Sequence, residues 1–228
     1  MRERSVTRVL RPKPVRARPP WWGRAKREIG AADPVLAAII ARHPRVALVS
    51  RGDAFSTLAR SIVGQQISVK AADAVWARFA ATLGEVSPKG LLRRRAPTLR
   101  RCGLSERKVE YLRDLARHFD DGRIDPRSLA ELSDEAVIAL LTDIRGIGRW
   151  TAEMFLIFNL LRPDVLPMDD LGLLKAISRS YLADVPTRTL LSRSGRERVE
   201  ALASAWAPWR SVATWYLWRS LDPVPVEY

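Results

Sequence analysis

The sequence predicts an all-α fold, and two observations carry this prediction. From residue 30 onward apolar residues recur at helical spacing, and no segment shows the sustained period-two alternation of β-branched residues that is typical of strands. Hydrophobic residues make up 47% of the 228-residue chain, enough for one or two domains with a sizeable core. We expect roughly nine to eleven helices and no strong internal repeat.

The expected helices begin at residues that commonly cap helix N-termini. Asp33 directly precedes Pro34, and this pair is typical of an N-cap followed by proline at the first helical position. The other expected N-caps are Asp53, Ser68, Ser105 and Ser133, and the glycines expected to end two of these helices are Gly84 and Gly122.

The charge of the chain indicates a polyanionic partner. Thirty-nine Lys and Arg against 25 Asp and Glu give a formal net charge of +14, and the sequence pI is about 11.0. Such a balance suits nucleic acid or an acidic membrane surface, and charge alone does not choose between them. The longest apolar runs are far too short for a membrane span, so we expect no membrane partner.

The first 28 residues differ in composition from the rest of the chain. They hold ten Lys or Arg and four prolines, which predicts a basic N-terminal extension (1–28) before an all-α domain (29–228). A solvated tail and an electrostatic arm that contacts phosphates both remain open, and Trp21 and Trp22 are candidates to anchor the extension.

A single cysteine, Cys102, limits the chemistry of the chain. It excludes intramolecular disulfides, zinc fingers and cysteine-held iron–sulfur clusters. The Arg-rich start is followed by proline rather than by an apolar core, so no secretory signal is recognised. We expect a cytoplasmic protein.

The segment RGIGRWTA (145–152) interrupts a helical pattern. A helix that ends near Ile144, a short turn with two glycines and a second amphipathic helix predict two helices joined by a tight turn over about 133–161. Such a turn exposes backbone N–H groups at a helix N-terminus, which suits a phosphate. An ordinary connection with Ile147 packed inside remains the alternative.

Two adjacent carboxylates open a later helix, in LPMDDLGLLKAI (166–177). One carboxylate is enough to cap the first turn of the helix. Because neighbouring side chains point in different directions, the second carboxylate needs another explanation. Facing a pocket, it could stabilise a cationic transition state or orient water.

Taken together, these motifs resemble those of a known family. The segments IVGQQISVKAA (62–72), GLSERKVEYLRDLA (103–116), LTDIRGIGRWTAEMF (141–155), LPMDDLGL (166–173) and APWRSVATWYLW (207–218) resemble the helix-hairpin-helix base-excision DNA glycosylases, of the bacterial DNA-3-methyladenine glycosylase II type. The resemblance implies two helical lobes with a cleft between them. Longer members carry an additional N-terminal β-rich domain, which residues 1–29 are too short to form.

The resemblance also implies roles for particular residues. The phosphate-binding hairpin would be formed by Arg145, Gly146, Ile147, Gly148 and Arg149. In this family the hairpin carbonyls can also hold a monovalent cation, but catalysis needs no metal or cofactor. The essential carboxylate would be Asp170, which leaves Asp169 as the helix cap.

Trp150 stands where members that also cleave the DNA backbone carry a lysine. The resemblance therefore implies a monofunctional enzyme that releases a base by hydrolysis and leaves an abasic site. The indole face of Trp150 suits a base made cationic by alkylation, and Trp218 would form the opposite wall of the base pocket. Helical spacing indicates core positions for the other tryptophans of the C-terminal segment, which are Trp206, Trp209 and Trp215.

The segment GQQIS (64–68) would fill the gap left by the extruded base. The resemblance places the intercalating wedge at Gln66, with Ile67 as the alternative, while a polar loop that leads into a helix capped by Ser68 explains the segment nearly as well. Arg107 and Lys108 are further candidates for phosphate contacts, against a solvated helix face.

The resemblance implies a glycosylase that excises alkylated purines such as 3-methyladenine and 7-methylguanine from damaged double-stranded DNA. We expect it to act as a monomer, associated with the nucleoid through DNA. Two alternatives stay open. One is a helix-hairpin-helix DNA-binding protein without catalysis, and the other is a glycosylase for deaminated or oxidised bases.

Overall fold

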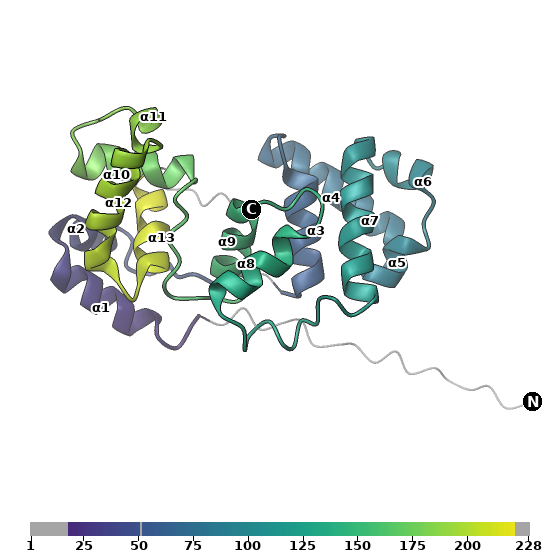
Figure 1. The fold of residues 1–228 in the computed structure, drawn as a ribbon, viewed down its shortest axis with the longest axis horizontal. Helices are drawn as coiled ribbons and strands as arrows, with labels where there is room; N and C mark the ends of the chain where they lie inside the picture. The colour runs from purple at the N-terminus through teal and green to yellow at the C-terminus, as the bar shows by residue number, and fades with distance from the viewer. Residues whose placement is uncertain (1–17, 51, 222–228) are drawn as a thin grey trace, which may run out of the picture.

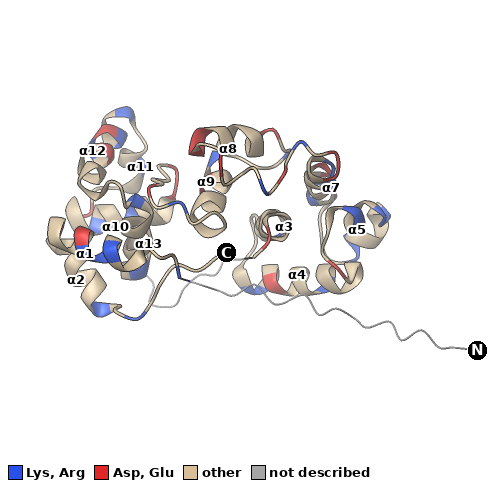
Figure 2. Cartoon of the chain, turned by 90° about the horizontal axis from the view of Figure 1, so that it is seen from below, with Lys and Arg blue, Asp and Glu red and all other residues tan. Residues whose placement is uncertain are grey.

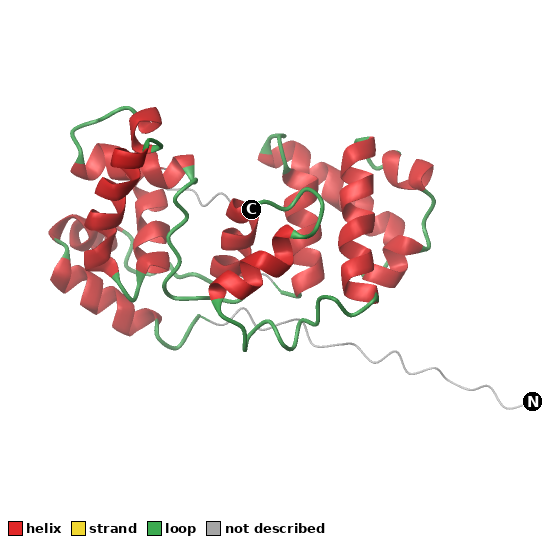
Figure 3. Ribbon diagram, viewed as in Figure 1, coloured by secondary structure: helices red, strands yellow, loops and turns green. Residues whose placement is uncertain are grey.

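The computed structural model describes residues 18–50 and 52–221, and every regular element in these two ranges is a helix (Figure 3). The elements are α1 (Trp22–Ala32), α2 (Pro34–Arg42), α3 (Ala54–Gly64), α4 (Val69–Leu83), α5 (Pro88–Leu92), α6 (Ala96–Arg100), α7 (Glu106–Asp120), α8 (Asp134–Thr142), α9 (Arg149–Phe158), α10 (Leu171–Tyr181), α11 (Thr187–Leu190), α12 (Arg193–Ala203), the 3-10 helix η1 (Ser204–Trp206) and α13 (Arg210–Leu221).

The predicted all-α class is confirmed, but the expected number of helices was too low. Within the described ranges there are thirteen α-helices and one 3-10 helix. Three of them, α5, α6 and α11, have only five, five and four residues. Helices of barely more than one turn leave no readable apolar period in the sequence.

The N-caps predicted at Asp33, Asp53, Ser68, Ser105 and Ser133 are confirmed. The Asp33 carboxylate accepts hydrogen bonds from two backbone N–H groups at the start of α2, where Pro34 is the first helical residue. The side chains of the other four predicted caps each accept a backbone hydrogen bond at the start of α3, α4, α7 or α8. Gly84 ends α4 with a φ of +79°, a conformation that favours glycine.

The helices form two lobes, as expected (Figure 1). One lobe contains the middle of the chain, α3 to α9, in which α7 packs against α3, α5 and α6. The other lobe, the C-terminal lobe, joins both ends of the described chain, because α1 and α2 pack with α13, and α13 packs with α10. Lys and Arg are spread over both lobes with acidic residues among them (Figure 2).

The N-terminal boundary differs from the expected one. Residue 28 falls inside α1, whose residue Trp22 is fully buried and packs edge-to-face on Trp215, with 5.4 Å between the ring centroids. Trp21 stacks on Trp209 at 5.7 Å. These tryptophans hold α1 on the C-terminal lobe, so the folded part begins before residue 29. Residues 1–17 lie outside the described residues.

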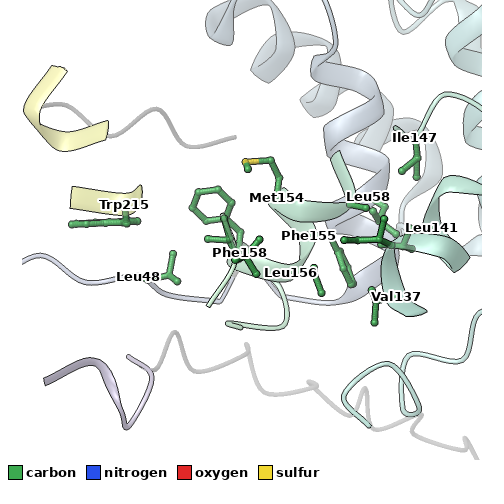
Figure 4. Close-up of a cluster of buried hydrophobic side chains, with 14 of the residues drawn as sticks. Leu48, Leu58, Val137, Leu141, Ile147, Met154, Phe155, Leu156, Phe158 and Trp215 are labelled. Atoms are coloured by element: carbon green, nitrogen blue, oxygen red, sulfur yellow. The ribbon is translucent and has the colours of Figure 1, made fainter. Parts of the chain in front are cut away.

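Helix α9 forms the centre of the core. Its residues 151–158 are all buried, and Ile147, just before it, lies in one apolar cluster with Leu58 of α3 and Leu141 of α8 (Figure 4). Trp206, Trp209 and Trp215 are buried as predicted. Among the described residues, no helix combines the length and apolar character that a membrane crossing requires.

Candidate active site

Asp170 lies at the start of α10 and is its N-cap. A turn closed by its own N–H, which donates to the Pro167 carbonyl at 3.0 Å, places Asp170 immediately before the first helical residue. Its Oδ1 then accepts the backbone N–H of Leu173 at 2.5 Å. The assignment of the cap to Asp169 was therefore wrong. Asp169 is half-exposed and forms an ion pair with Arg196 of α12.

Two tryptophans donate to the same carboxylate. The indole Nε1 of Trp150, on α9, lies 2.8 Å from Oδ2 of Asp170, and that of Trp218, on α13, lies 2.8 Å from Oδ1. Asp170 is only 8% exposed. The structure thus brings the three residues that we expected in the site into direct contact, and they come from both lobes.

The remaining acceptor capacity of Asp170 distinguishes it from a purely structural carboxylate. A carboxylate offers about four lone-pair positions. Asp33 uses four, for two backbone N–H groups, the Tyr181 hydroxyl and the Trp206 indole. Asp170 uses three, so Oδ2, which accepts only Trp150 among the described groups, keeps one position for another partner.

Two residues that the sequence did not single out complete this arrangement. Phe158 stacks on Trp218, with ring centroids 5.8 Å apart and 14° between the planes. A Cβ at Gly172 would lie 3.1 Å from Oδ1 of Asp170 and 3.4 Å from the Trp218 ring, so a glycine lets the indole approach the carboxylate. The motif DDLGL contains Gly172, but only the structure shows what approaches it.

In the hairpin, the two glycines have different roles. Gly146 has a φ of +82°, and a Cβ there would lie 2.2 Å from the Tyr111 ring, so both conformation and space require glycine. Gly148 has an ordinary φ of −96° with open space around it, and as the N-cap of α9 it offers no side chain to the first N–H groups of the helix. The first N–H groups of α9 are thus placed as anion donors.

Ile147 differs from the other residues of the hairpin. Its side chain is buried, and its N–H donates to the Ile144 carbonyl at 3.1 Å inside the turn. This N–H already has a partner inside the turn, and the phosphate contact expected at Ile147 stays a prediction. The Ile147 side chain is packed inside the turn, as the alternative of an ordinary connection expects. Gly146 and Gly148 remain the candidates for the phosphate contact.

The hairpin arginines are paired with carboxylates. Arg149 lies 2.5 and 3.0 Å from the two carboxylate oxygens of Glu135 and donates through Nε to Glu153 at 3.1 Å. Arg145 lies 2.6 Å from Glu110. A phosphate that binds these side chains must compete with the acidic partners, so the backbone N–H groups are the better anion donors.

Glu153 is the second buried carboxylate in this region. Burial raises its pKa to about 7, an effect that the neighbouring Arg149 partly opposes. No described group donates a hydrogen bond to its Oε2. Sequence reasoning missed Glu153, since a glutamate inside a helix is most often solvated.

The hairpin carbonyls offer the neutral oxygens that suit a monovalent cation, but two of them already accept hydrogen bonds. The Gly146 carbonyl accepts the Gln65 side chain at 2.8 Å, and the Ile144 carbonyl accepts the Ile147 N–H. Each keeps one lone pair. With one lone pair each, these carbonyl oxygens fit a weakly bound cation at most. No step of the proposed reaction requires a cation.

The expected wedge segment lies in the loop between α3 and α4. Gln66 is exposed with a φ of +58°, and Ile67 is 40% exposed. Lys108 does not face outward as a phosphate contact would, because its Nζ donates to the carbonyls of Val63 and Gln65.

Comparison with known proteins places this chain in a family. The HhH-GPD superfamily of base excision DNA repair proteins matches residues 59–201, more than half of the chain. The DNA-3-methyladenine glycosylase 1 of Schizosaccharomyces pombe is 34% identical over 177 residues, which cover 75% of this chain and 74% of that protein.

Solved structures agree with this match. A DNA-3-methyladenine glycosidase from Bacillus halodurans superposes with a TM-score of 0.76 at 36% identity, covering 87% of this chain and 89% of that one. The S. pombe 3-methyladenine DNA glycosylase Mag1, solved in complex with abasic DNA, superposes with a TM-score of 0.72 at 29% identity, covering 90% of this chain and 98% of that one. The chain therefore belongs to the HhH-GPD superfamily of base excision DNA repair proteins.

Proposed function

We propose that the chain is a monofunctional DNA glycosylase that hydrolyses the N-glycosidic bond of alkylated, cationic purines in duplex DNA and leaves an abasic site. The observation that carries the proposal is the Asp170 carboxylate, which accepts two indole N–H groups and keeps one acceptor position that no described group fills. The substrate class is supported by the names of two relatives, the DNA-3-methyladenine glycosylase 1 of S. pombe and the DNA-3-methyladenine glycosidase of B. halodurans.

Asp170 acts on the sugar. As the C1′–N bond breaks, positive charge develops on the anomeric carbon and ring oxygen, and a nearby carboxylate of low exposure stabilises it. The bonding electrons leave with the base, whose positive charge they neutralise, so no general acid is needed. Water adds to C1′ and loses a proton, for which the free position on Oδ2 is the acceptor.

Trp150 and Trp218 select the base. Their N–H edges are bound to Asp170, so a base that stacks on them must use a ring face, and one face of Trp218 packs on Phe158. An electron-rich indole attracts a cationic purine over a neutral one. With tryptophan at position 150, the site has no amine there to attack the sugar, which supports hydrolysis without strand cleavage.

The test is single-turnover release of bases from methylated duplex DNA, with strand cleavage followed separately. We expect methylated purines to be released, strands to break only after alkali treatment, and Asp170→Asn to lose release while it still binds DNA. Asp33→Asn is the matched control. It disrupts a capping carboxylate with a similar indole partner, so it should lower stability while its folded fraction keeps activity.

Other outcomes would contradict the proposal. Binding without release from methylated, deaminated or oxidised duplexes would identify a DNA-binding protein without catalysis. Release confined to deaminated or oxidised bases would show that alkylated purines are not the substrates. Strand cleavage without alkali would exclude the monofunctional mechanism.

A further inference from the structure

The loop between α3 and α4 is held in place by polar contacts from two other elements. Lys108, in the first turn of α7, donates through Nζ to the Val63 carbonyl at 2.8 Å and to the Gln65 carbonyl at 2.7 Å. The Gln65 side chain donates through Nε2 to the Gly146 carbonyl of the hairpin at 2.8 Å. The loop is thus joined to both α7 and the hairpin.

These contacts satisfy groups that helix geometry leaves open. The last carbonyls of a helix have no partner within it, and those at the end of α3 receive the Lys108 ammonium instead of water. The ammonium is partly buried, which lowers the pKa of Lys108. A lysine that served only solubility or phosphate contact would keep its ammonium in water.

The residue that these contacts present is in an unfavourable backbone conformation. Gln66 has a φ of +58°, which is uncommon for a residue other than glycine and persists only where the surroundings fix it. Its side chain is exposed at the tip of the loop. Gln65, which precedes it, is bound on both its carbonyl and its side chain.

We propose that Lys108 and Gln65 are positioning residues that hold Gln66 ready to enter the gap left by an extruded base, at a fixed distance from the phosphate-binding hairpin. The inference rests on the proposed glycosylase function. A loop ordered in advance loses less conformational entropy when it inserts into the base stack, so extrusion becomes more favourable.

This role predicts a dependence on the base opposite the lesion. Extrusion costs most when the lesion is paired and stacked, and least when it is already unpaired. A defect in wedge positioning should therefore slow excision from a paired lesion and be rescued when the lesion faces an abasic site. A general loss of structure would slow both substrates equally.

The experiment compares Lys108→Met with Arg107→Met in the full chain. Arg107 is exposed one residue away, so its variant removes the same charge from the same helical turn without touching the loop contacts. Single-turnover excision is measured on duplexes with one 7-methylguanine opposite cytosine or opposite an abasic site. We expect Lys108→Met to be slower by about tenfold or more on the first and within about twofold on the second. Arg107→Met should keep the ratio of wild type.

Gln65→Leu provides a second variant in case Lys108→Met does not fold, because it removes only the bond to the hairpin. It should show the same pattern. An equal loss on both duplexes, or no loss on either, would overturn the inference.

A readout without excision separates this inference from the proposed function. 2-Aminopurine placed opposite a tetrahydrofuran abasic analogue reports entry of the loop into the gap by a change in fluorescence. Wild type and Arg107→Met should give the change at saturating protein, and Lys108→Met should not. If wild type excises nothing, the glycosylase proposal fails, while the fluorescence still decides the role of Lys108.

Discussion

The indole N–H of Trp150 lies 2.8 Å from Oδ2 of Asp170, so one tryptophan contributes a ring to the site and also a hydrogen bond to the carboxylate. The sequence suggested only the ring face, as a surface for a cationic base. The bond restricts the side chains of both residues, and it joins α9 of one lobe to the start of α10 in the other.

Trp150→Phe separates these two contributions. Phenylalanine keeps an aromatic face but removes the N–H donor, and a hydrogen bond to a charged group contributes about 1.5–3 kcal/mol. We expect single-turnover excision to fall by about 10- to 100-fold, with the Kd for DNA, measured by fluorescence anisotropy, within about threefold of wild type. Trp150→Leu, which removes the aromatic face as well, should be slower still. Excision by Trp150→Phe at the wild-type rate would show that the bond does not contribute.

Gly148→Ala and Gly146→Ala should affect different properties. A methyl group at Gly148 enters open space, so the free energy of unfolding should stay within about 0.5 kcal/mol of wild type. The Kd for duplex DNA should rise, because a phosphate can no longer approach the backbone. Gly146→Ala meets the Tyr111 ring at a positive φ and should lower the Tm by several degrees. Unchanged DNA affinity in Gly148→Ala would remove the phosphate contact from this hairpin.

The fold was predictable where local rules determine it. The caps Asp33 and Ser105, like the glycine turn at 146–148, follow from hydrogen bonding and backbone sterics within a few residues, and the structure has them where the sequence placed them. The short helices were missed, because one turn of helix forms only through tertiary packing.

The site was predictable in its members but less so in their contacts. Which of two adjacent aspartates caps α10 depends on how the preceding turn closes, and this cannot be read from the pair itself. Lys108 looked like any solvated lysine, since its partners lie 43 and 45 residues away in the chain. The burial of Glu153 likewise results from the packing of α9 between other helices.

Glu153→Gln should make stability less dependent on pH. In the unfolded chain a glutamate loses its proton near its ordinary pKa of 4.5, whereas burial holds the proton on Glu153 up to about pH 7. The folded state therefore binds more protons in this window, and wild-type stability falls as the pH rises through it. The glutamine can still accept from Arg149 but does not ionise. We expect similar Tm values for both proteins at pH 4.5 and a higher Tm for Glu153→Gln at pH 8, and a constant difference at both pH values would contradict this assignment.

Removal of residues 1–17 tests the electrostatic arm. The deletion takes away six Lys or Arg and one Glu, and it leaves Trp22 and the whole of α1 in place on the C-terminal lobe. Each phosphate neutralised contributes about 0.9 to the slope of log K against log salt, so an arm that contacts DNA should flatten that slope by several units and weaken binding at low salt. Single-turnover excision at saturating enzyme should change little, because Asp170, Trp150 and Trp218 are untouched.

A second variant with the six basic residues replaced by glutamine keeps the chain length, so it distinguishes loss of charge from loss of chain. If neither variant changes the salt slope, the segment is a solvated tail and the phosphate contacts belong to the folded domain alone.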